Sequence, residues 1–421
     1  MIRHPLATLA TMFLVACVEL PAQSSCHTNH LTIFDANIAE FFEVRTIDLQ
    51  SGPNLVEWRS LMPQTYIRTI RVTTSDRTTV TRQDVTYDGA EVRGQKSPVL
   101  HLVLQNAGQA GPRKVQIDYL APGLSWKADY SLAMGPSAAS GTPTEMQLDG
   151  WATIQNDTGA DICAATVDLV AGEVQLLLPG ATGVRTYTAN SQIAGMSPGV
   201  GFAPEPLTEV KGISVFSRFR LGRNIALTAN AQVDRFLLFQ SRKLPLEQRN
   251  VFENEANAQT LGRGGFMLAP RGLEVRLVSR NESDSPLPAG LITIYTQDDE
   301  VPQVVGQDQI PLTRVSADFS VTQGRSNLLE GTRRILDRKT VPDPSAVNRS
   351  KVVTQVEVVI TNHGANAATA LVREGVDGNA REWNVTESSH PHQKLGDRMM
   401  EIKLTVPGNG SVTLDYTVES R

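Results

Sequence analysis

The chain has 421 residues, of which 40% are hydrophobic, 20% charged and 5% aromatic, and its formal net charge is −5. This weakly acidic balance excludes a protein that binds nucleic acid by neutralising phosphates. The aromatic content is low for a protein that stacks on sugars or single strands, while the length leaves room for two or three domains.

Residues 1–24 have the pattern of a signal peptide. Arg3 precedes an apolar run at residues 6–18, which has the length of a signal-peptide core and is too short to span a bilayer. An uncleaved anchor is disfavoured for the same reason. We expect the rest of the chain to be exported, to the periplasm or the cell envelope.

Two cleavage sites compete. Leu14-Val15-Ala16-Cys17 resembles a bacterial lipobox, and its use would make Cys17 the lipidated first residue of an outer-membrane lipoprotein. Ala22-Gln23-Ser24 follows the helix-breaking Pro21 and fits an ordinary signal-peptidase site at a typical distance from the apolar run. A membrane is an expected partner only if Cys17 is lipidated.

The chain has three cysteines, Cys17, Cys26 and Cys163. Cleavage removes Cys17 or lipid consumes it, so an even pair remains in an oxidising compartment. We predict a disulfide between Cys26 and Cys163; the alternative is that both are small buried hydrophobic residues. Two cysteines are too few for a four-ligand zinc site, and we expect no metal or cofactor.

Residues 28–110 are expected to form an N-terminal β-domain. Apolar residues alternate from Phe42 to Leu49, and turn formers follow at 51–54 and at Asp88-Gly89. The segment 106–112 is rich in turn formers, which places the first domain boundary there.

Residues 113–340 are expected to form a central β-rich domain. Its first part, residues 115–172, alternates apolar and polar residues, which is typical of antiparallel strands with one wet face. A long loop is predicted near 181–210. The Gly/Pro-rich stretch 191–206 within it is either a recognition element or a variable insertion.

Residues 345–421 are expected to form a C-terminal β-sandwich. Two alternating strands there flank the turn Pro407-Gly408-Asn409-Gly410. No window shows the 3.6-residue apolar period of a helix. The predicted fold class is all-β, with tandem antiparallel β-sandwich domains and few helices.

An ordered set of residues resembles a known family. In chain order, the set consists of Tyr119, Pro122, Trp126, Tyr130, Asn156, Thr158, Gly159, Leu169 and the segments PLPAGLITIY, VGQDQI, EVVITNHG and VTLDYTV. It is similar to the bacterial domain of unknown function 4139, found in proteins like the mucoidy inhibitor A protein. The likeness covers residues 113–421, and residues 31–110 look like the β-module that precedes this domain.

The resemblance implies a β-rich fold and a place in the bacterial envelope. Many relatives carry a long coiled coil between the two parts, whereas this chain has only the short segment 106–112. The family brings no established catalytic residues to this sequence.

Two histidine clusters contain metal-binding residue types. His390 and His392, with Glu387 nearby, form the better one, because alternate residues of a strand point to one face. The polar sequence around them favours an exposed loop. Cys26-His27 with His30 is interpreted as the tail of the mature chain.

Two acidic turns contain residue types that bind cations. Asp298-Asp299-Glu300 has oxygen ligands for calcium, but the sequence around it favours a solvated turn. Asp157, Thr158 and Asp161 form a turn that ordinary Asx-type hydrogen bonding explains.

The four tryptophans, Trp58, Trp126, Trp151 and Trp383, have apolar neighbours at strand-like spacing. Exposed tryptophans stack on sugars, but this pattern favours core positions between sheets.

These observations predict an exported bacterial envelope protein that binds or scaffolds without catalysis. We expect no catalytic residues, because nucleophile-elbow, zinc-protease and phosphate-loop motifs do not occur. The expected partner is an unknown envelope protein or polysaccharide. One alternative is a hydrolase that acts on envelope polymers, and another is a structural surface or adhesin-like module.

Overall fold

The computed structural model describes residues 26–75, 77–92, 94–135, 143–172, 174–176, 185–187, 210–213, 216–229, 233–254, 267–298, 301–343, 350–375 and 382–421. These residues form strands joined by turns, and the one helical element among them is the 3₁₀ turn η1 (Ile67–Thr69). The predicted all-β class is confirmed. Within the same residues, no helix has the length and apolar content needed to cross a membrane.

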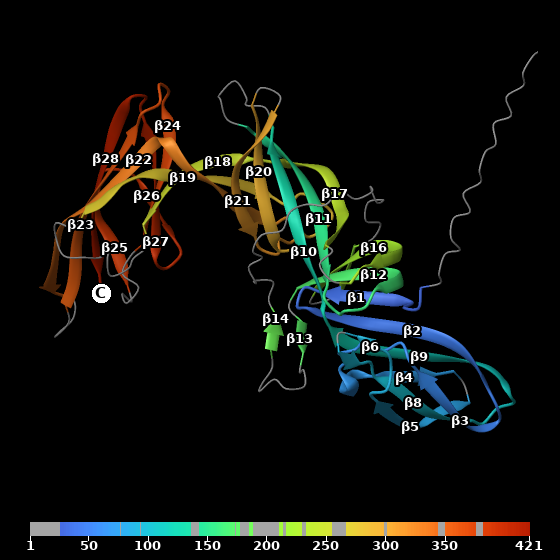
Figure 1. The fold of residues 1–421 in the computed structure, drawn as a ribbon. Coiled ribbons are helices and arrows are strands. Elements are labelled where there is room, and N and C mark those ends of the chain that lie inside the picture. Colours follow the sequence, from blue (N-terminus) through green and yellow to red (C-terminus); the bar gives the residue numbers. More distant parts are fainter. Residues whose placement is uncertain are drawn as a thin grey trace, which may run out of the picture.

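The first sheet has seven strands in the order β15-β16-β12-β1-β2-β9-β4 (Figure 1). Its strands are β1 (His30–Phe34), β2 (Ile38–Leu49), β4 (Arg71–Thr74), β9 (Gly111–Pro122), β12 (Ile162–Gly172), β15 (Val210–Ile213) and β16 (Phe216–Leu227). The short strand β1 lies in the middle, parallel to β12 and antiparallel to β2.

A smaller sheet with the order β3-β8-β5 shares its core with the first sheet. Its strands are β3 (Gly52–Trp58), β5 (Thr78–Thr86) and β8 (Val99–Asn106). Two further pairs are β6 (Glu91–Val92) with β7 (Gln95–Lys96), and β13 (Val174–Leu176) with β14 (Arg185–Tyr187).

The central sheet has five strands in the order β17-β11-β10-β20-β21. They are β10 (Leu124–Met134), β11 (Glu145–Asn156), β17 (Val233–Pro245), β20 (Gly290–Asp298) and β21 (Val301–Ile310). β10 is antiparallel to β11 and parallel to β20. In Figure 1 these strands stand between the first sheet and the C-terminal sheet.

The C-terminal sheet has nine strands in the order β25-β28-β23-β22-β19-β18-β24-β27-β26. They are β18 (Glu247–Asn254), β19 (Met267–Arg280), β22 (Asp318–Pro342), β23 (Ser350–Asn362), β24 (Ala368–Gly375), β25 (Trp383–Ser388), β26 (His392–Leu395), β27 (Met399–Val406) and β28 (Gly410–Ser420). Buried residues from both halves of this order share one core, so the sheet folds over on itself.

Two large apolar cores organise the described residues. The first runs from Leu31 to Val321 and joins the first, the three-stranded and the central sheets. The second runs from Phe252 to Val418 and fills the C-terminal sheet. Burying each large apolar side chain contributes roughly 2–3 kcal/mol, so the two cores dominate the stability of the fold.

The sheets cross both domain boundaries predicted between 28–110, 113–340 and 345–421. β9 begins at Gly111 but pairs along its whole length with β2. β22 spans residue 340 and pairs with both β19 and β23. The prediction was wrong because turn formers mark the end of a strand, whereas the strand's partner decides the unit to which it belongs.

The sheets are also not purely antiparallel. Three strand pairs are parallel, namely β1 with β12, β10 with β20, and β18 with β24. Each partner comes from a distant part of the chain, which local alternation does not reveal. The predicted loop near 181–210 contains the short strand β14; its stretch 191–206 lies outside the described residues, as do residues 1–24 and Cys17.

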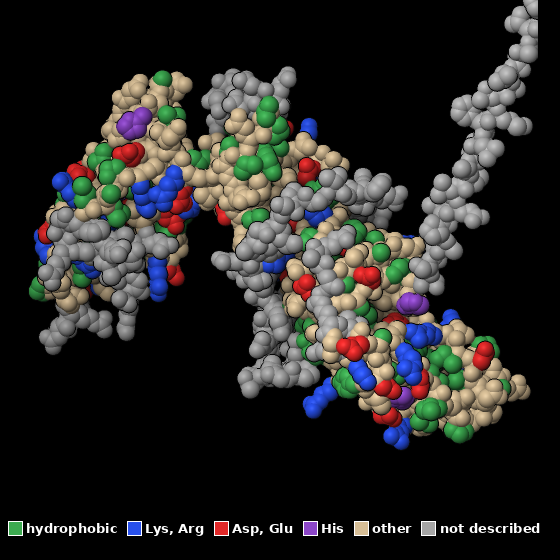
Figure 2. Space-filling model, viewed as in Figure 1, with side chains coloured by type: hydrophobic (Ala, Val, Ile, Leu, Met, Phe, Trp, Pro, Cys, Tyr) green, Lys and Arg blue, Asp and Glu red, His purple; other side chains and the backbone are tan. Residues whose placement is uncertain are grey.

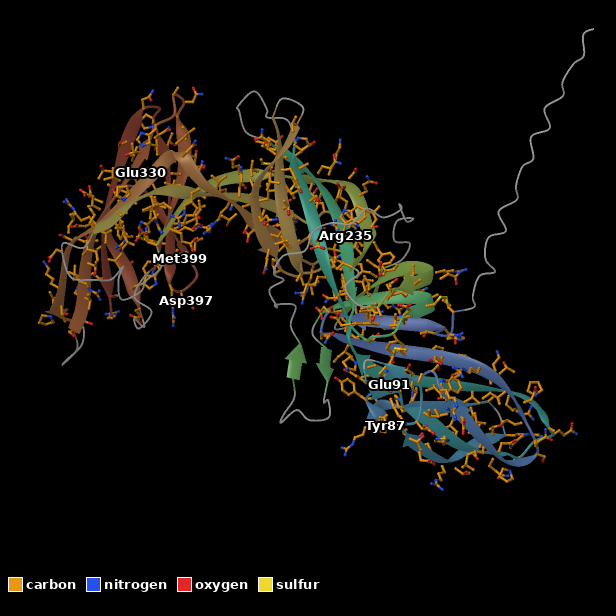
Figure 3. All side chains as sticks on the ribbon, in the orientation of Figure 1. Tyr87, Glu91, Arg235, Glu330, Asp397 and Met399 are labelled. Atoms are coloured by element: carbon orange, nitrogen blue, oxygen red, sulfur yellow. A yellow bond between two sulfur atoms is a disulfide. The ribbon has the colours of Figure 1, made fainter. Side chains whose placement is uncertain are left out.

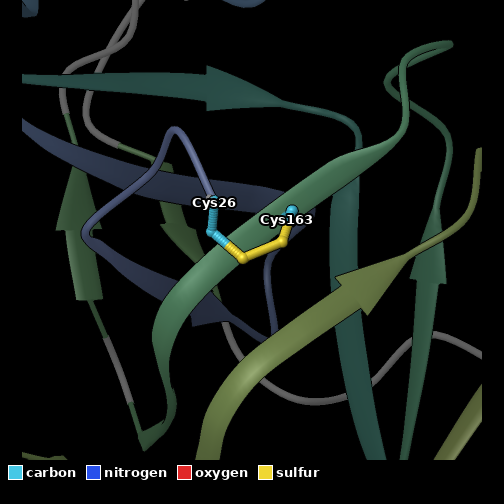
Figure 4. The surroundings of a disulfide bond; sticks show 2 residues. All are labelled: Cys26 and Cys163. Atoms are coloured by element: carbon cyan, nitrogen blue, oxygen red, sulfur yellow. A yellow bond between two sulfur atoms is a disulfide. The ribbon is translucent and has the colours of Figure 1, made fainter. Parts of the chain in front are cut away.

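A disulfide joins Cys26 to Cys163, as the cysteine count predicts (Figure 4). Their Cα atoms are 4.8 Å apart and their separation in sequence is 137 residues. Cys26 lies just before β1 and Cys163 lies in β12, so the bond fixes the start of the described chain to a central strand. Such a bond fits an oxidising compartment.

Candidate functional site

The central sheet has one buried face and one open face. Along β10 and β11 buried and accessible residues alternate strictly, so that Tyr130 and Ala152 point into the first core. β20 continues the pattern, because Ile292 is fully buried while Leu291 is 42% exposed. We define the outer face as the odd-numbered residues of β10, β11 and β20 with their register partners on β17 and β21.

Trp151 and Tyr295 lie on this outer face. Trp151 is half-buried and stands in one row with Asp129 and Leu291. Tyr295 is also half-buried and pairs with Val304, which is 60% exposed. Figure 2 shows hydrophobic side chains gathered over β20 and β21. The face therefore combines two aromatic rings with accessible aliphatic side chains.

On the outer face, Arg235 contacts the Trp151 ring, and Thr153 contacts the neighbouring Asp129 carboxylate. The Arg235 guanidinium lies 5.1 Å from the centre of the Trp151 ring; Figure 3 labels Arg235 beside β11 and β17. Such a cation–π contact at an exposed site is worth about 0.5–1 kcal/mol. The Thr153 hydroxyl donates a hydrogen bond to Asp129 Oδ2. Both contacts orient side chains without removing them from solvent.

Further hydrogen bonds connect polar groups along the outer face. Gln147 Nε2 donates to Ser241 Oγ over 2.8 Å, and Gln307 Nε2 donates to Thr293 Oγ1 over 3.1 Å. Amides, hydroxyls and carboxylates thus stand beside the aromatic rings. A rigid sheet that presents both kinds of group is suited to binding a ligand that has apolar surfaces and hydroxyl groups.

The polar side of the first sheet is organised differently, around Asp168. This residue is fully buried; Arg220 Nε lies 2.9 Å from its Oδ1, and His30 Nε2 and Arg218 Nε lie 3.3 and 3.5 Å from its Oδ2. Burial by itself raises the pKa of Asp168, but hydrogen bonds and charges from His30 and Arg220 outweigh it and lower the pKa to about 2. We call these four residues the Asp168 cluster.

Thr166, which lies beside the Asp168 cluster, forms with His30 and Asp168 a line of groups like that of a hydrolase triad. His30 Nδ1 lies 2.6 Å from Thr166 Oγ1, so that a hydroxyl, an imidazole and a carboxylate follow one another. Thr166 Oγ1 also donates to the Asn29 carbonyl over 3.1 Å, and β12 is an inner strand that pairs with β1 and β16. Its backbone N–H groups therefore serve the sheet and do not form an oxyanion hole.

Asp35 lies in the turn between β1 and β2, close to Lys127 of the outer face. Burial raises the pKa of Asp35 to about 6, against a backbone hydrogen bond and the charge of Lys127. Burial likewise lowers the pKa of Lys127, against the charges of Asp129 and Asp35. The pair lies where the first sheet meets the central sheet.

A third polar group lies in the C-terminal sheet around the buried Glu374. Glu374 accepts hydrogen bonds from Arg333 Nε at 2.8 Å, Tyr416 Oη at 2.7 Å and Asn254 Nδ2 at 2.6 Å. Burial raises the pKa of the Tyr416 hydroxyl well above its ordinary value. A pocket of about 380 Å³, part of which is open solvent, borders Arg333, Glu374 and Tyr416. Because these groups satisfy one another, we interpret the cluster as part of the core.

The structure distributes the predicted metal-binding residues over separate elements. His392 begins β26 and is exposed, while Glu387 in β25 accepts a hydrogen bond from Thr417. His30 belongs to the Asp168 cluster and not to a tail, so that interpretation was wrong. Among the described residues, no group of three His, Cys, Asp or Glu side chains has the geometry for a metal ion.

The turn at 157–161 is held by ordinary hydrogen bonds, as predicted. Asn156 Oδ1 accepts from the Thr158 hydroxyl at 2.7 Å, and Asp161 Oδ1 accepts from the Ala229 backbone. Of the other acidic turn, Asp299 and Glu300 lie outside the described residues.

Three of the four tryptophans are core residues, with Trp58, Trp126 and Trp383 at most 9% exposed. Trp151 is the exception, and its assignment to the core was wrong. The signal was present in the sequence, because the apolar neighbours Met146, Leu148 and Ile154 are all even-numbered and Trp151 falls on the polar side of β11.

No protein-family model matches the chain, and neither a curated protein nor a solved structure matches it.

Proposed function

We propose that this chain is an exported protein of the bacterial envelope that binds a partner through the outer face of the central sheet, without covalent catalysis. The observation that carries the proposal is the accessible row of Trp151, Asp129 and Leu291 on a rigid sheet. Accessible apolar side chains among polar groups are typical of binding surfaces.

Two further features support the proposal. The disulfide between Cys26 and Cys163 fits an exported chain, in line with the signal pattern at residues 1–24. Tyr119, Trp126 and Tyr130, which carry the resemblance to the domain 4139 family, are at most 2% exposed. Framework residues of this kind are what members of one fold family are expected to share.

A hydrolase that acts on envelope polymers is the alternative, and the line Thr166–His30–Asp168 is the observation that favours it. This alternative requires Thr166 to form a covalent acyl or glycosyl intermediate. If Thr166→Val abolishes turnover of an envelope polymer, the non-catalytic proposal is wrong. A structural or adhesin-like module would instead use exposed strand edges and would tolerate changes on the outer face.

Site-specific photo-crosslinking in the source bacterium tests the proposal. A benzophenone amino acid is placed at Leu291, on the outer face, and in a control at Tyr87, which is 59% exposed on the N-terminal part of the chain. We expect irradiation to give a discrete adduct from position 291 only. Equal labelling from both positions, or none from 291, overturns the proposed binding face. Mass spectrometry of the mature N-terminus checks export, and a cytoplasmic full-length product contradicts it.

A further inference from the structure

We infer that the partner of the outer face is a linear, uncharged polysaccharide, an inference that rests on the proposed function. The arrangement of the aromatic rings favours an extended ligand. Trp151 and Tyr295 lie two strands and four residues apart, which places them about 16 Å from each other on a flat sheet. A ligand that contacts both rings must be extended, as a chain of several sugar units is.

The polar groups beside the rings match the hydroxyl groups of a sugar. A pyranose ring has apolar C–H faces that stack on aromatic rings and a rim of hydroxyl groups that need hydrogen-bond partners. On the outer face, Asp129 and Thr153 flank Trp151, and Gln307 and Thr293 lie in the next row. These groups supply both donors and acceptors, which a hydroxyl requires.

The charge of the outer face favours an uncharged ligand. It carries three basic side chains, Lys127, Arg235 and Lys243, and three acidic ones, Asp129, Asp149 and Glu145, so that its formal charge is zero. A nucleic acid or a uronate polymer would require an excess of positive charge. A neutral polymer meets no such requirement. The low aromatic content of the chain as a whole does not conflict with this inference, since two rings on one face suffice.

A protein partner is the competing occupant, and the outer face differs from a typical protein interface. Its most exposed apolar residues, Leu291 and Val304, lie at the β20–β21 side, while its middle strand β10 presents Asp129 and Ser131. Protein interfaces have the opposite arrangement, with an apolar centre and a polar rim. A hydroxyl-rich polymer is better matched to a polar centre between two rings.

Affinity electrophoresis tests the inference on the purified, disulfide-bonded protein. Native gels contain hydroxyethylcellulose, glucomannan or dextran as neutral probes, alginate as a charged probe, or no polymer. We expect at least one neutral polymer to retard the protein and alginate to leave it unaffected. The inference fails if no neutral polymer retards the protein or if alginate retards it more strongly.

Variants connect retardation to the outer face. Trp151→Ala and Tyr295→Ala should each weaken binding by about tenfold, because each removes one of the two rings on which a sugar can stack. Tyr87→Ala, which removes an exposed aromatic ring elsewhere, should bind as the wild type does. Retardation that is unchanged in Trp151→Ala overturns the inference, provided that thermal melts show the variant folded.

The outcomes also separate this inference from the proposed function. A crosslink from position 291 to an envelope protein, with no retardation by neutral polymers, refutes the polysaccharide and leaves the binding face standing. The absence of both a crosslink and retardation refutes the binding face itself.

Discussion

The first sheet and the central sheet each turn a polar face away from the same core, but they use it in opposite ways. In the Asp168 cluster, a fully buried carboxylate is surrounded by His30, Arg218 and Arg220. On the outer face of the central sheet, Leu291 and Val304 remain exposed and Trp151 remains half-accessible. Polar groups whose partners lie within the fold stabilise it, whereas accessible groups are available to a ligand.

Removal of the disulfide should lower the free energy of unfolding more than the other changes below, and it should destabilise the first sheet. Cys26→Ser combined with Cys163→Ser is expected to lower the free energy of unfolding by about 5 kcal/mol, because a loop of 137 residues is released in the unfolded chain. Urea denaturation measures the loss, and a reducing agent should leave the double variant unchanged. A loss below about 1 kcal/mol would show that strand pairing alone holds β1.

Asp168→Asn should cost about 3 kcal/mol at pH 7, because it leaves two arginines and His30 around an uncharged buried group. The folded pKa of about 2 lies below the ordinary 3.8, so this stability is present above pH 4 and disappears as the pH falls towards 2. The difference between wild type and variant, measured by denaturation from pH 7 to pH 3, should shrink accordingly.

Asp118→Asn is the matched control for that experiment. Its partner Arg71 is 73% exposed, so the loss should stay below about 1 kcal/mol. Equal losses in the two variants would contradict the distinction between a buried cluster and a surface ion pair.

Asp35→Asn should increase the free energy of unfolding, by a smaller amount than Asp168→Asn lowers it. Burial raises the folded pKa of Asp35 to about 6, so its ionisation opposes folding above that pH and ceases to do so as the pH falls towards 4. We expect a gain of about 1–2 kcal/mol at pH 7, reduced from the full shift because the side chain is partly accessible. Thermal melts at pH 7.5 and pH 4 measure it. The exposed Asp48→Asn should show no such gain.

Trp151→Ala should lower the free energy of unfolding least, by less than about 1 kcal/mol, although it should weaken binding by the outer face about tenfold. Trp126→Ala is the contrasting variant, with an expected loss of about 3–5 kcal/mol, because Trp126 is 2% exposed and donates a hydrogen bond to the Val170 carbonyl. Denaturation of both proteins compares the two faces directly. A Trp151→Ala loss as large as that of Trp126→Ala would place Trp151 in the core.

Local patterns in the sequence were sufficient to predict strands and the wet face of the central sheet. Alternation in residues 115–172 correctly indicated β10 and β11, since apolar side chains repeat every second residue there. The disulfide followed from counting cysteines in an oxidising compartment. The same alternation also places Trp151 on the outer side of β11. The core assignment of Trp151 rested on its residue type and not on its position in the strand.

Long-range pairing could not be predicted from local patterns. His30 and Asp168 meet because β1 lies parallel to β12, and nothing in either segment names the other as its partner. The predicted boundaries at residues 110 and 340 were wrong for the same reason, because β9 pairs with β2 and β22 pairs with β23 on the other side of them. The outer face likewise depends on β20, which joins β10 from 162 residues further along the chain and brings Leu291 beside Asp129.

The position of the disulfide has a mechanical consequence. If the chain is tethered through residues before Cys26, a pulling force first reaches the bond to Cys163 and passes directly into β12. β12 pairs with β16 along nearly its whole length and with β1 at Val167–Val170, so the load acts on many hydrogen bonds at once. The short strand β1 is thereby shielded from being peeled out of the sheet when the chain is pulled from that side.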